Sequence, residues 1–386
     1  MNKIKIFFYS GKRGGINSLV PLIKKLIKFK HLHIKVIFSD MHLEREFGNT
    51  FNEFNFLKKN AIFSKSLFKS DSLYFRTKSI SKGLNANVEI IKKYKPNFLI
   101  LLGDRSELFS IAIPAMIYNI PIVHFYGGDL TQGCTDEQTR HAISMMSNYH
   151  FVSNEQSKKN LMKFGIEKNN IHNVGFLSLD SSNQKNFESC QKIYKNFKLN
   201  IKKKLIISIL HPETWEINKN KKKIKNYFDA LNSIKENIIF IYPCSDPGYK
   251  EIIINIKKIC SINKNFYFFK NIEANKFYNL LNCADLIIGN SSTGIIESNF
   301  FNTPSLNIGD RQKNRLRGKN IMDIHFNKIL IEKSIKSILS RKKENSKMKR
   351  NNSHIYFKKN SVDNTVKILK KIISKKSHKQ IIFNLN

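Results

Sequence analysis

The chain has 386 residues, which is longer than one ordinary domain, and its 41% hydrophobic content is enough for two cores. Its 67 Lys and Arg against 29 Asp and Glu give a net charge of +38. The lysines are spread over the whole length, so we interpret them as solvated helix faces and predict no nucleic-acid partner. The apolar run at the N-terminus, Ile4–Tyr9, is too short for a signal peptide or a membrane span, and we expect no membrane insertion.

The cysteines are odd in number and widely separated, and no pair has the spacing of a metal site. They are Cys134, Cys190, Cys244, Cys260 and Cys283. We therefore expect free thiols and a reducing cytoplasmic location. The sequence has no metal-ligand cluster, so we expect no metal, and we also expect no cofactor.

The first predicted elements are a strand over Ile4–Tyr9, a glycine-rich turn over residues 10–15 and a helix over residues 16–29. A strand, glycine loop and helix in this order direct backbone amides at phosphate, although the dinucleotide fingerprint is absent. Arg13 in this turn is either a phosphate contact or an exposed loop arginine. A further strand is expected over residues 33–38.

A strand–helix–strand unit follows over residues 98–126. Its two strands should be parallel, so their carboxyl ends lie at the same edge of the sheet. Asp104 follows the first strand and Asp129 follows the second. Open α/β sheets bind ligands at this edge, and the two carboxylates therefore indicate a site.

A helix is predicted to begin near Thr135. A spacing of four places Asp136 beside Arg140 and Glu137 beside His141. These residues are either part of the site or a solvated helix start in which acidic side chains favour the positive end of the dipole.

The polar segment over residues 181–200 has no convincing strand, and we place a domain boundary there. Strands over residues 205–210, 237–242, 266–269 and 285–288 alternate with helices, which predicts a second parallel α/β domain. The expected organisation is a first domain over residues 1–180, a second over residues 201–345 and a basic helical tail over residues 346–386.

The second half has a glycine- and serine-rich loop over residues 289–294, followed by a predicted helix start. Small residues and helix amides suit a diphosphate, but Ser291 or Ser292 could equally be a simple helix cap. Glu297 is close enough in sequence to reach sugar hydroxyls. The loop over residues 309–319 then concentrates cations between two glycines.

These motifs resemble the hydrolysing UDP-N-acetylglucosamine 2-epimerases. The resemblance runs from residue 1 to about residue 345 and is carried by the segments Gly103-Asp104-Arg105-x-Glu107, His124-x-x-Gly127-Gly128-Asp129, Asp136-Glu137-x-x-Arg140-His141, Ile288-Gly289-Asn290-Ser291-Ser292-x-Gly294 and Gly309-Asp310-Arg311-Gln312-Lys313. It implies a GT-B-type α/β fold, with two Rossmann-like doubly wound domains and the active site in the cleft between them. It also implies conversion of UDP-N-acetylglucosamine and water to N-acetylmannosamine and UDP through a 2-acetamidoglucal, in sialic-acid-type sugar biosynthesis.

Residue roles follow from the same resemblance. The expected catalytic residues are Asp104, Asp129, Asp136 and His211. The expected substrate and UDP contacts are Arg13, Glu137, Arg140, Ser291, Ser292, Gly294, Glu297 and Arg311. Relatives commonly have Gly-Gly-Glu where this chain has Gly127-Gly128-Asp129, and the shorter carboxylate leaves the identity of the sugar open.

The alternatives are a 2-epimerase of UDP-2,4-diacetamido-2,4,6-trideoxyhexose in a legionaminic-type pathway, a GT-B glycosyltransferase, or a nucleotide-sugar-binding protein without turnover. Relatives imply a homodimer or a higher homo-oligomer.

Overall fold

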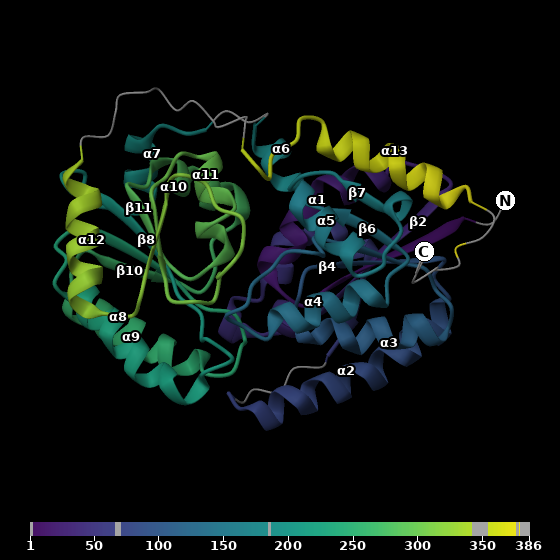
Figure 1. Ribbon diagram of the computed structural model, residues 1–386, viewed down its shortest axis with the longest axis horizontal. Coiled ribbons are helices and arrows are strands. Elements are labelled where there is room, and N and C mark those ends of the chain that lie inside the picture. Colours follow the sequence, from purple (N-terminus) through teal and green to yellow (C-terminus); the bar gives the residue numbers. More distant parts are fainter. Residues whose placement is uncertain (1–2, 66–70, 184–186, 342–353, 376–377, 379–386) are drawn as a thin grey trace. The chain divides into compact units, whose positions relative to one another are not determined.

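The computed structural model describes residues 3–65, 71–183, 187–341, 354–375 and 378. The chain divides into two compact units. Unit 1 consists of Met1–Leu130, Thr135–Ser181 and Tyr356–Asn386, and unit 2 of Thr131–Cys134 and Ser182–Ile355 (Figure 1). Residues 356–375, which the sequence assigned to a separate tail, are therefore part of unit 1.

Unit 1 is built on a seven-stranded parallel sheet with the order β3-β2-β1-β4-β5-β6-β7. Its strands are β1 (Ile4–Ser10), β2 (Leu32–Ser39), β3 (Ala61–Ser64), β4 (Phe98–Leu102), β5 (Ile122–Phe125), β6 (Tyr149–Val152) and β7 (Ile171–Asn173). The strand order reverses between β1 and β4, as it does in Rossmann-like sheets, where ligands bind outside the carboxyl ends of the strands at this reversal.

The helices of unit 1 cover both faces of this sheet. They are α1 (Arg13–Leu26), α2 (Leu73–Tyr94), α3 (Phe109–Ile117), α4 (Asp136–Met145), α5 (Glu155–Lys163), α6 (Leu177–Asn183) and α13 (Ser361–Ile373). Helix α1 begins three residues earlier than predicted, because its first turn accommodates Gly14 and Gly15. Asn154 caps α5 by accepting from the Ser157 N–H.

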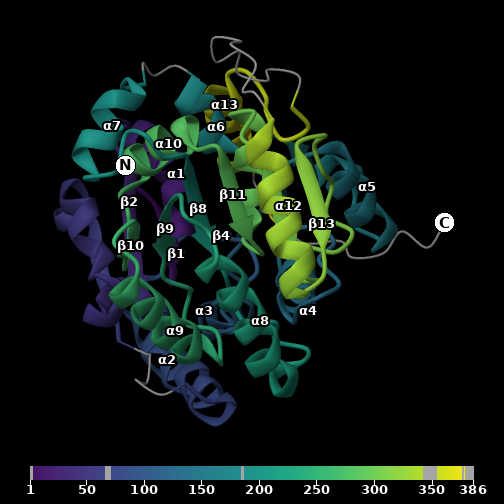
Figure 2. The ribbon, with the colours of Figure 1, turned by 90° about the vertical axis from the view of Figure 1, so that its left-hand side faces the viewer.

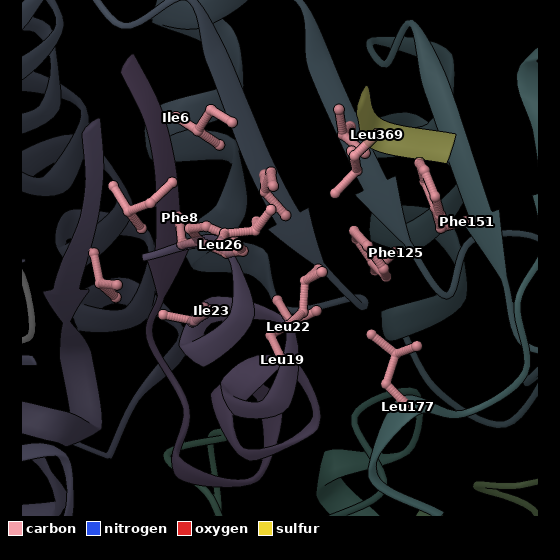
Figure 3. Packing of buried hydrophobic residues seen from close by; sticks show 14 of the residues in the cluster. Ile6, Phe8, Leu19, Leu22, Ile23, Leu26, Phe125, Phe151, Leu177 and Leu369 are labelled. Atoms are coloured by element: carbon pink, nitrogen blue, oxygen red, sulfur yellow. The ribbon is translucent and has the colours of Figure 1, made fainter. Parts of the chain in front are cut away.

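Successive side chains of each strand point to opposite faces of the sheet, so unit 1 has an apolar cluster on each face. Ile6 and Phe8 of β1 pack in one cluster with α1, whereas Phe7 and Tyr9 pack in another with α2, α3 and α4. Figure 3 shows the first cluster, in which Leu19, Leu22, Ile23 and Leu26 of α1 lie near the sheet together with Leu369 of α13.

Helix α13 joins unit 1 because one of its faces is apolar. Val362, Val366, Leu369 and Ile372 recur at helical spacing and are buried in the α1 cluster. The apolar stripe is visible in the sequence, but its partner lies more than three hundred residues earlier, so the sequence reading left it in a basic tail.

Unit 2 has a six-stranded parallel sheet with the order β10-β9-β8-β11-β12-β13. Its strands are β8 (Leu205–Ile209), β9 (Asn237–Ile241), β10 (Phe266–Phe269), β11 (Leu286–Gly289), β12 (Ser305–Ile308) and β13 (Ile321–Ile324). Its helices are α7 (Cys190–Asn196), α8 (Asn220–Asn232), α9 (Tyr249–Ile262), α10 (Ala274–Cys283), α11 (Glu297–Phe300) and α12 (Lys328–Ser340), of which α12 packs against α8 and β11 (Figure 2). The order again reverses, here between β8 and β11, and the prediction of two Rossmann-like domains is confirmed.

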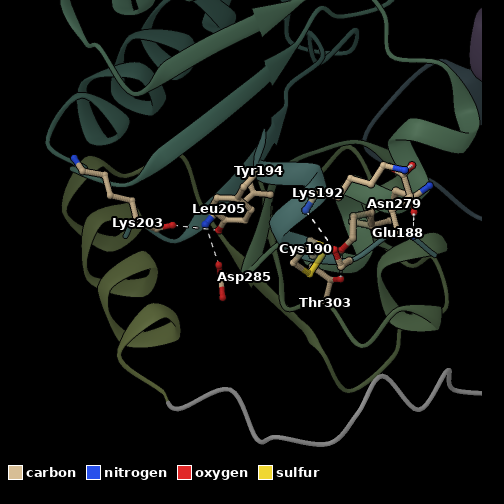
Figure 4. Close-up of a disulfide and its surroundings, with 12 residues drawn as sticks. Glu188, Cys190, Lys192, Tyr194, Lys203, Leu205, Asn279, Asp285 and Thr303 are labelled. Atoms are coloured by element: carbon tan, nitrogen blue, oxygen red, sulfur yellow. Dashed lines mark hydrogen bonds and ion pairs between the residues drawn. A yellow bond between two sulfur atoms is a disulfide. The ribbon is translucent and has the colours of Figure 1, made fainter. Parts of the chain in front are cut away.

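The expectation that all five cysteines are free thiols is wrong in this structure. Cys190 at the start of α7 forms a disulfide with Cys283 at the end of α10, while Cys134, Cys244 and Cys260 are free (Figure 4). The paired cysteines are 93 residues apart in sequence, and only the packing of α7 on α10 brings their Cα atoms to 5.5 Å.

Within the part of the chain that the structure describes, no helix combines the length and the apolar character needed to cross a bilayer.

Candidate active site

The strand-order reversal of unit 1 carries an ion-paired carboxylate. Asp104 lies in the turn after β4, and Lys12 lies at the start of α1 after β1. The Lys12 Nζ is 3.5 Å from Asp104 Oδ1, and the Arg140 Nη2 is 2.5 Å from Asp104 Oδ2. The carboxylate is therefore held between two cations at the edge where such sheets bind ligands.

Arg140 connects both acidic loops. Its guanidinium is fully buried, and its Nη1 donates to the Asp129 carbonyl at 2.8 Å. Burial lowers the pKa of Arg140, but the charges of Asp104 and Asp129 outweigh burial and raise it above the ordinary value. The parallel pairing of β4 with β5 thus brings the Asp104 and Asp129 loops to one edge, as predicted.

The Asp129 side chain points into unit 1. Its Oδ1 accepts from the Asn154 Nδ2 at 3.2 Å and from the Ser157 hydroxyl, and the residue is buried. These bonds fasten the loop after β5 to the start of α5. The geometry gives Asp129 an anchoring role, which the sequence did not indicate, beside the catalytic role that it predicted.

The start of α4 supplies two further carboxylates. Asp136 and Glu137 occupy its first turn, and Glu137 Oε1 lies 3.7 Å from the His141 Nε2. Burial, and then the charge of Arg140, lower the pKa of His141. Both pairs predicted from the spacing of four therefore interact, since the charge of Asp136 also contributes to the raised pKa of Arg140.

A buried charge network that the sequence reading missed lies beside this site. Arg76 of α2 donates to Asp40 Oδ2 at 2.7 Å, contacts the Glu107 carboxylate, and donates to the Ser106 hydroxyl at 3.1 Å. Burial raises the pKa of Asp40, against the opposing effect of Arg76. The network braces the turn that follows Asp104. Glu107 was part of the quoted motif, but Arg76 lies in a stretch for which no element was predicted.

Arg13 is the first residue of α1, and its side chain lies outside the described part of the structure. Its predicted contact with phosphate stays a prediction.

In unit 2, Asn290 joins the two strand ends at the reversal. Its Oδ1 accepts from the His211 N–H at 2.7 Å, and its Nδ2 donates to the His211 carbonyl at 2.9 Å. The His211 Nδ1 in turn accepts from the Cys244 N–H at 3.3 Å. His211 is therefore fixed by its backbone and by its ring.

The cation-rich loop is attached to the same asparagine. Arg311 Nη1 and Gln312 Nε2 both donate to the Asn290 carbonyl, at 3.3 and 3.1 Å. Glu213 Oε1 accepts from the Asp310 N–H at 2.9 Å, which ties the loop to the turn after β8. Ser291 and Ser292 are half-buried next to this junction.

Four residues from the first half of the sequence also pack here. Gln132 N–H donates to the Lys313 carbonyl at 3.2 Å, and Cys134 Sγ lies 3.7 Å from the Arg311 carbonyl oxygen. A Cβ at Gly133 would lie 1.9 Å from the Asp310 oxygen, so only glycine allows this approach.

The helix that the sequence predicts after this loop is shorter than expected. Ser291 accepts from the Thr293 N–H and caps a single turn, Ser292–Gly294, and α11 begins only at Glu297 and has four residues. Helices this short have little aligned dipole, so the cation-rich loop is the better candidate for anion binding in unit 2.

Among the residues described, no group of three or more His, Cys, Asp and Glu side chains is placed to hold a metal ion.

Comparisons with known proteins identify the family of the chain. A family model described as UDP-N-acetylglucosamine 2-epimerase matches residues 24–370. The chain belongs to this family. A Campylobacter jejuni relative named GDP/UDP-N,N'-diacetylbacillosamine 2-epimerase (hydrolyzing) is 35% identical over 85% of this chain and 86% of its own length. A Legionella pneumophila relative named UDP-N,N'-diacetylbacillosamine 2-epimerase (hydrolyzing) is 30% identical over 83% and 85%.

The fold of the family is also found among solved structures. The UDP-GlcNAc 2-epimerase of Neisseria meningitidis, solved bound to UDP-GlcNAc, superposes with a TM-score of 0.77 at 17% identity. The match covers 95% of this chain and 100% of that one. At this identity the likeness concerns the fold, which is of the GT-B type that the sequence predicted.

Proposed function

We propose that this protein is a hydrolysing 2-epimerase that converts a UDP-linked 2-acetamido sugar and water to the free C2 epimer and UDP. The observation that carries the proposal is the Asp104 carboxylate, held by Arg140 and Lys12 at the strand-order reversal of unit 1. Membership of the epimerase family supports it.

The proposed reaction has two steps. A base removes the C2 proton, a double bond forms between C1 and C2, and the C1–O bond breaks with its electron pair leaving on UDP. Water then adds its oxygen to C1 of the glycal and gives up one proton to a base, and an acid returns a proton to C2 on the opposite face. Carboxylates suit both proton transfers. We propose Asp104 and Asp136 for these transfers, and Asp129 as a further candidate.

Departure of UDP calls for positive charge and hydrogen-bond donors near the diphosphate. We propose that unit 2 supplies them through Arg311, His211 and the loop over residues 289–294, with Ser291, Ser292 and Gly294 next to the diphosphate and Glu297 on sugar hydroxyls. The hydrogen bonds that join both His211 and Arg311 to Asn290 support a shared role for these residues at the diphosphate. Arg13 and Glu137 complete the proposed substrate contacts, while the buried Arg140 orients Asp104.

Two substrates fit this chemistry. UDP-N-acetylglucosamine is the one that the sequence favours, and it would place the product in sialic-acid-type synthesis. The UDP-2,4-diacetamido-2,4,6-trideoxy sugar is favoured by the names of the relatives with 35% and 30% identity. We propose the diacetamido sugar as the preferred substrate.

The test is incubation of each UDP-sugar with the protein in deuterated water, followed by NMR of the products. The proposal expects UDP and a free sugar with deuterium at C2 and inverted configuration there, formed faster from the diacetamido substrate. Faster turnover of UDP-N-acetylglucosamine would reverse the substrate assignment and keep the mechanism. Release of UDP only with an added acceptor, and without labelling, would indicate a glycosyltransferase, and no release from either sugar would indicate a binding protein.

We further propose a cytoplasmic homodimer or higher homo-oligomer. The oligomeric state rests on the family, and light scattering coupled to gel filtration tests it. A monomer at micromolar concentration would contradict it.

A further inference from the structure

One buried histidine in unit 1 contacts the turn that carries Asp104. His124 of β5 is fully buried, and both of its ring nitrogens have partners. Its Nε2 lies 2.8 Å from the Gly103 carbonyl oxygen and its Nδ1 lies 3.0 Å from the Ser144 hydroxyl. A carbonyl oxygen can only accept, so Nε2 carries the proton and Nδ1 accepts from Ser144.

These two partners belong to the elements that hold Asp104. Gly103 directly precedes Asp104 in the chain, and Ser144 is four residues after Arg140, on the same side of α4. The ring of His124 therefore spans from the turn that presents the carboxylate to the helix that presents its guanidinium partner.

The loop after β5 lies against His124 and Ser144. A Cβ added to Gly127 would lie 2.5 Å from the Ser144 oxygen and 2.9 Å from the His124 Nδ1. The glycine therefore lets the backbone that leads to Asp129 lie directly on the histidine and the serine.

The charged and titratable groups that face the ring are Arg140, Asp104, His141 and His150. Burial dominates and lowers the pKa of His124 to about 4. The ring is thus neutral at neutral pH, as its single donated hydrogen bond requires.

We propose that His124 is a positioning residue of the epimerase, whose hydrogen bonds to Gly103 and Ser144 set the Asp104 carboxylate relative to Arg140. The proposal rests on the proposed function, because the reaction is its main readout. The ring of His124 is fully buried and both of its nitrogens are engaged by Gly103 and Ser144, so we place it behind the reacting groups and not in contact with them. It acts through the backbone before Asp104, and small displacements of a reacting group are costly in rate.

The chain offers a matched control. His150 of β6 is the register partner of His124, is equally buried, and has a pKa that burial lowers to about 3. Both of its ring nitrogens lack a side-chain partner among the described residues. Replacing it disturbs the same part of the core without touching the Gly103 hydrogen bond.

The experiment compares His124→Gln with His124→Met, and His150→Gln with His150→Met. Glutamine and methionine have similar length, but only the glutamine amide nitrogen can donate to the Gly103 carbonyl. We expect His124→Met to lose about 10- to 100-fold in kcat with little change in KM, and His124→Gln to recover most of it. The two His150 variants should share one kcat. Equal kcat for the two folded His124 variants would overturn the proposal.

A second measurement does not depend on activity, and it uses a variant only to assign the signal. Nitrogen-15 NMR of the wild-type histidines should give one ring with Nε2 protonated and Nδ1 accepting, unchanged between about pH 6 and 8. The signal that His124→Gln removes is the assigned ring. A ring that titrates in this range, or that has the opposite tautomer, would contradict the proposal. Absence of turnover by the wild type with both sugars would instead contradict the proposed function, while the tautomer still tests the geometry.

Discussion

At the scale of single residues, Asp104 has partners from two different elements. Arg140 comes from α4, and Lys12 comes from the turn before α1. The Arg140 side chain is 1% exposed and that of Asp104 is 14% exposed. The carboxylate thus keeps limited access to solvent while its cation is buried, which suits a group that meets a ligand on one side and the protein on the other.

Asp104→Asn tests this assignment. The amide oxygen can still accept from Arg140, so we expect the fold to persist while proton transfer fails. The expected loss in turnover is about 100- to 10,000-fold. UDP affinity, measured by calorimetry, should stay within a few-fold, because Asp104 is not among the proposed diphosphate contacts and most of these lie in unit 2.

The control for this variant is Asp229→Asn, which removes an exposed carboxylate paired with Lys225. It should retain full turnover. Near-normal activity of Asp104→Asn, or its unfolding by circular dichroism, would contradict the catalytic assignment.

At the scale of elements, the junction of β8 and β11 depends on one side chain. Asn290 is fully buried, bonds both backbone groups of His211, and offers its carbonyl to Arg311 and Gln312. Asn290→Ala leaves the His211 groups unpaired, and we expect a loss of about 1–3 kcal/mol in the free energy of unfolding. UDP affinity should fall as well.

Asn237→Ala is the matched comparison. Asn237 is equally buried and lies at the amino end of β9, away from the carboxyl ends where the site lies. Its side chain accepts from the Asn200 N–H and donates to the carbonyls of Asn200 and Lys203. It should lower the urea midpoint to a similar extent without changing UDP affinity. Equal loss of UDP affinity in both variants would mean that Asn290 acts only through stability.

The disulfide between α7 and α10 is the second test at this scale. It closes a loop of 93 residues, and we expect it to add about 2–4 kcal/mol to the stability of unit 2 when it is formed. Dithiothreitol should therefore lower the urea midpoint of the wild type but not that of the double variant Cys190→Ser, Cys283→Ser.

Thiol counting checks the bond directly. Alkylation of the denatured, unreduced protein should label Cys134, Cys244 and Cys260, and reduction should add the other two. Labelling of all five before reduction would show that the bond does not form.

At the scale of the whole molecule, the buried histidines make unit 1 sensitive to acid. Burial lowers the pKa of His124 to about 4 and that of His150 to about 3. The ordinary pKa is about 6.5, so on acidification the unfolded chain takes up these protons first. Their contribution to stability is full above about pH 6.5 and is lost as the pH falls toward 4.

Between about pH 7.5 and pH 5 the expected loss is about 2 kcal/mol for each ring, because below about pH 6.5 the unfolded ring binds a proton that the folded ring does not. The raised pKa of Asp40 acts in the opposite sense, because its carboxyl takes up a proton in the folded state. Urea unfolding at about pH 7.5 and pH 5 measures the net change. His150→Gln should flatten this dependence, and equal stability of the wild type at both values would contradict the prediction.

The alternation of strands and helices could be read from the sequence alone. This alternation also shows which residues lie at the carboxyl ends of the parallel strands in each unit, where ligands bind. The short apolar runs before Asp104, Asp129 and Gly289 are local signals, and parallel pairing then places whatever follows them at the carboxyl edge. The motif around Asp104 and Arg140 also identified the family. These features depend on a few neighbouring residues or on a spacing of four.

Other features were decided only by the tertiary structure. Arg76 meets Asp40 and Glu107, and Cys190 meets Cys283. Helix α13 joins the core of unit 1, and residues 131–134 pack in unit 2. Each of these depends on contacts between segments that are far apart in the chain. A side chain's partner across such a distance is set by how whole elements pack, and neither the spacing nor the local composition of the sequence records it.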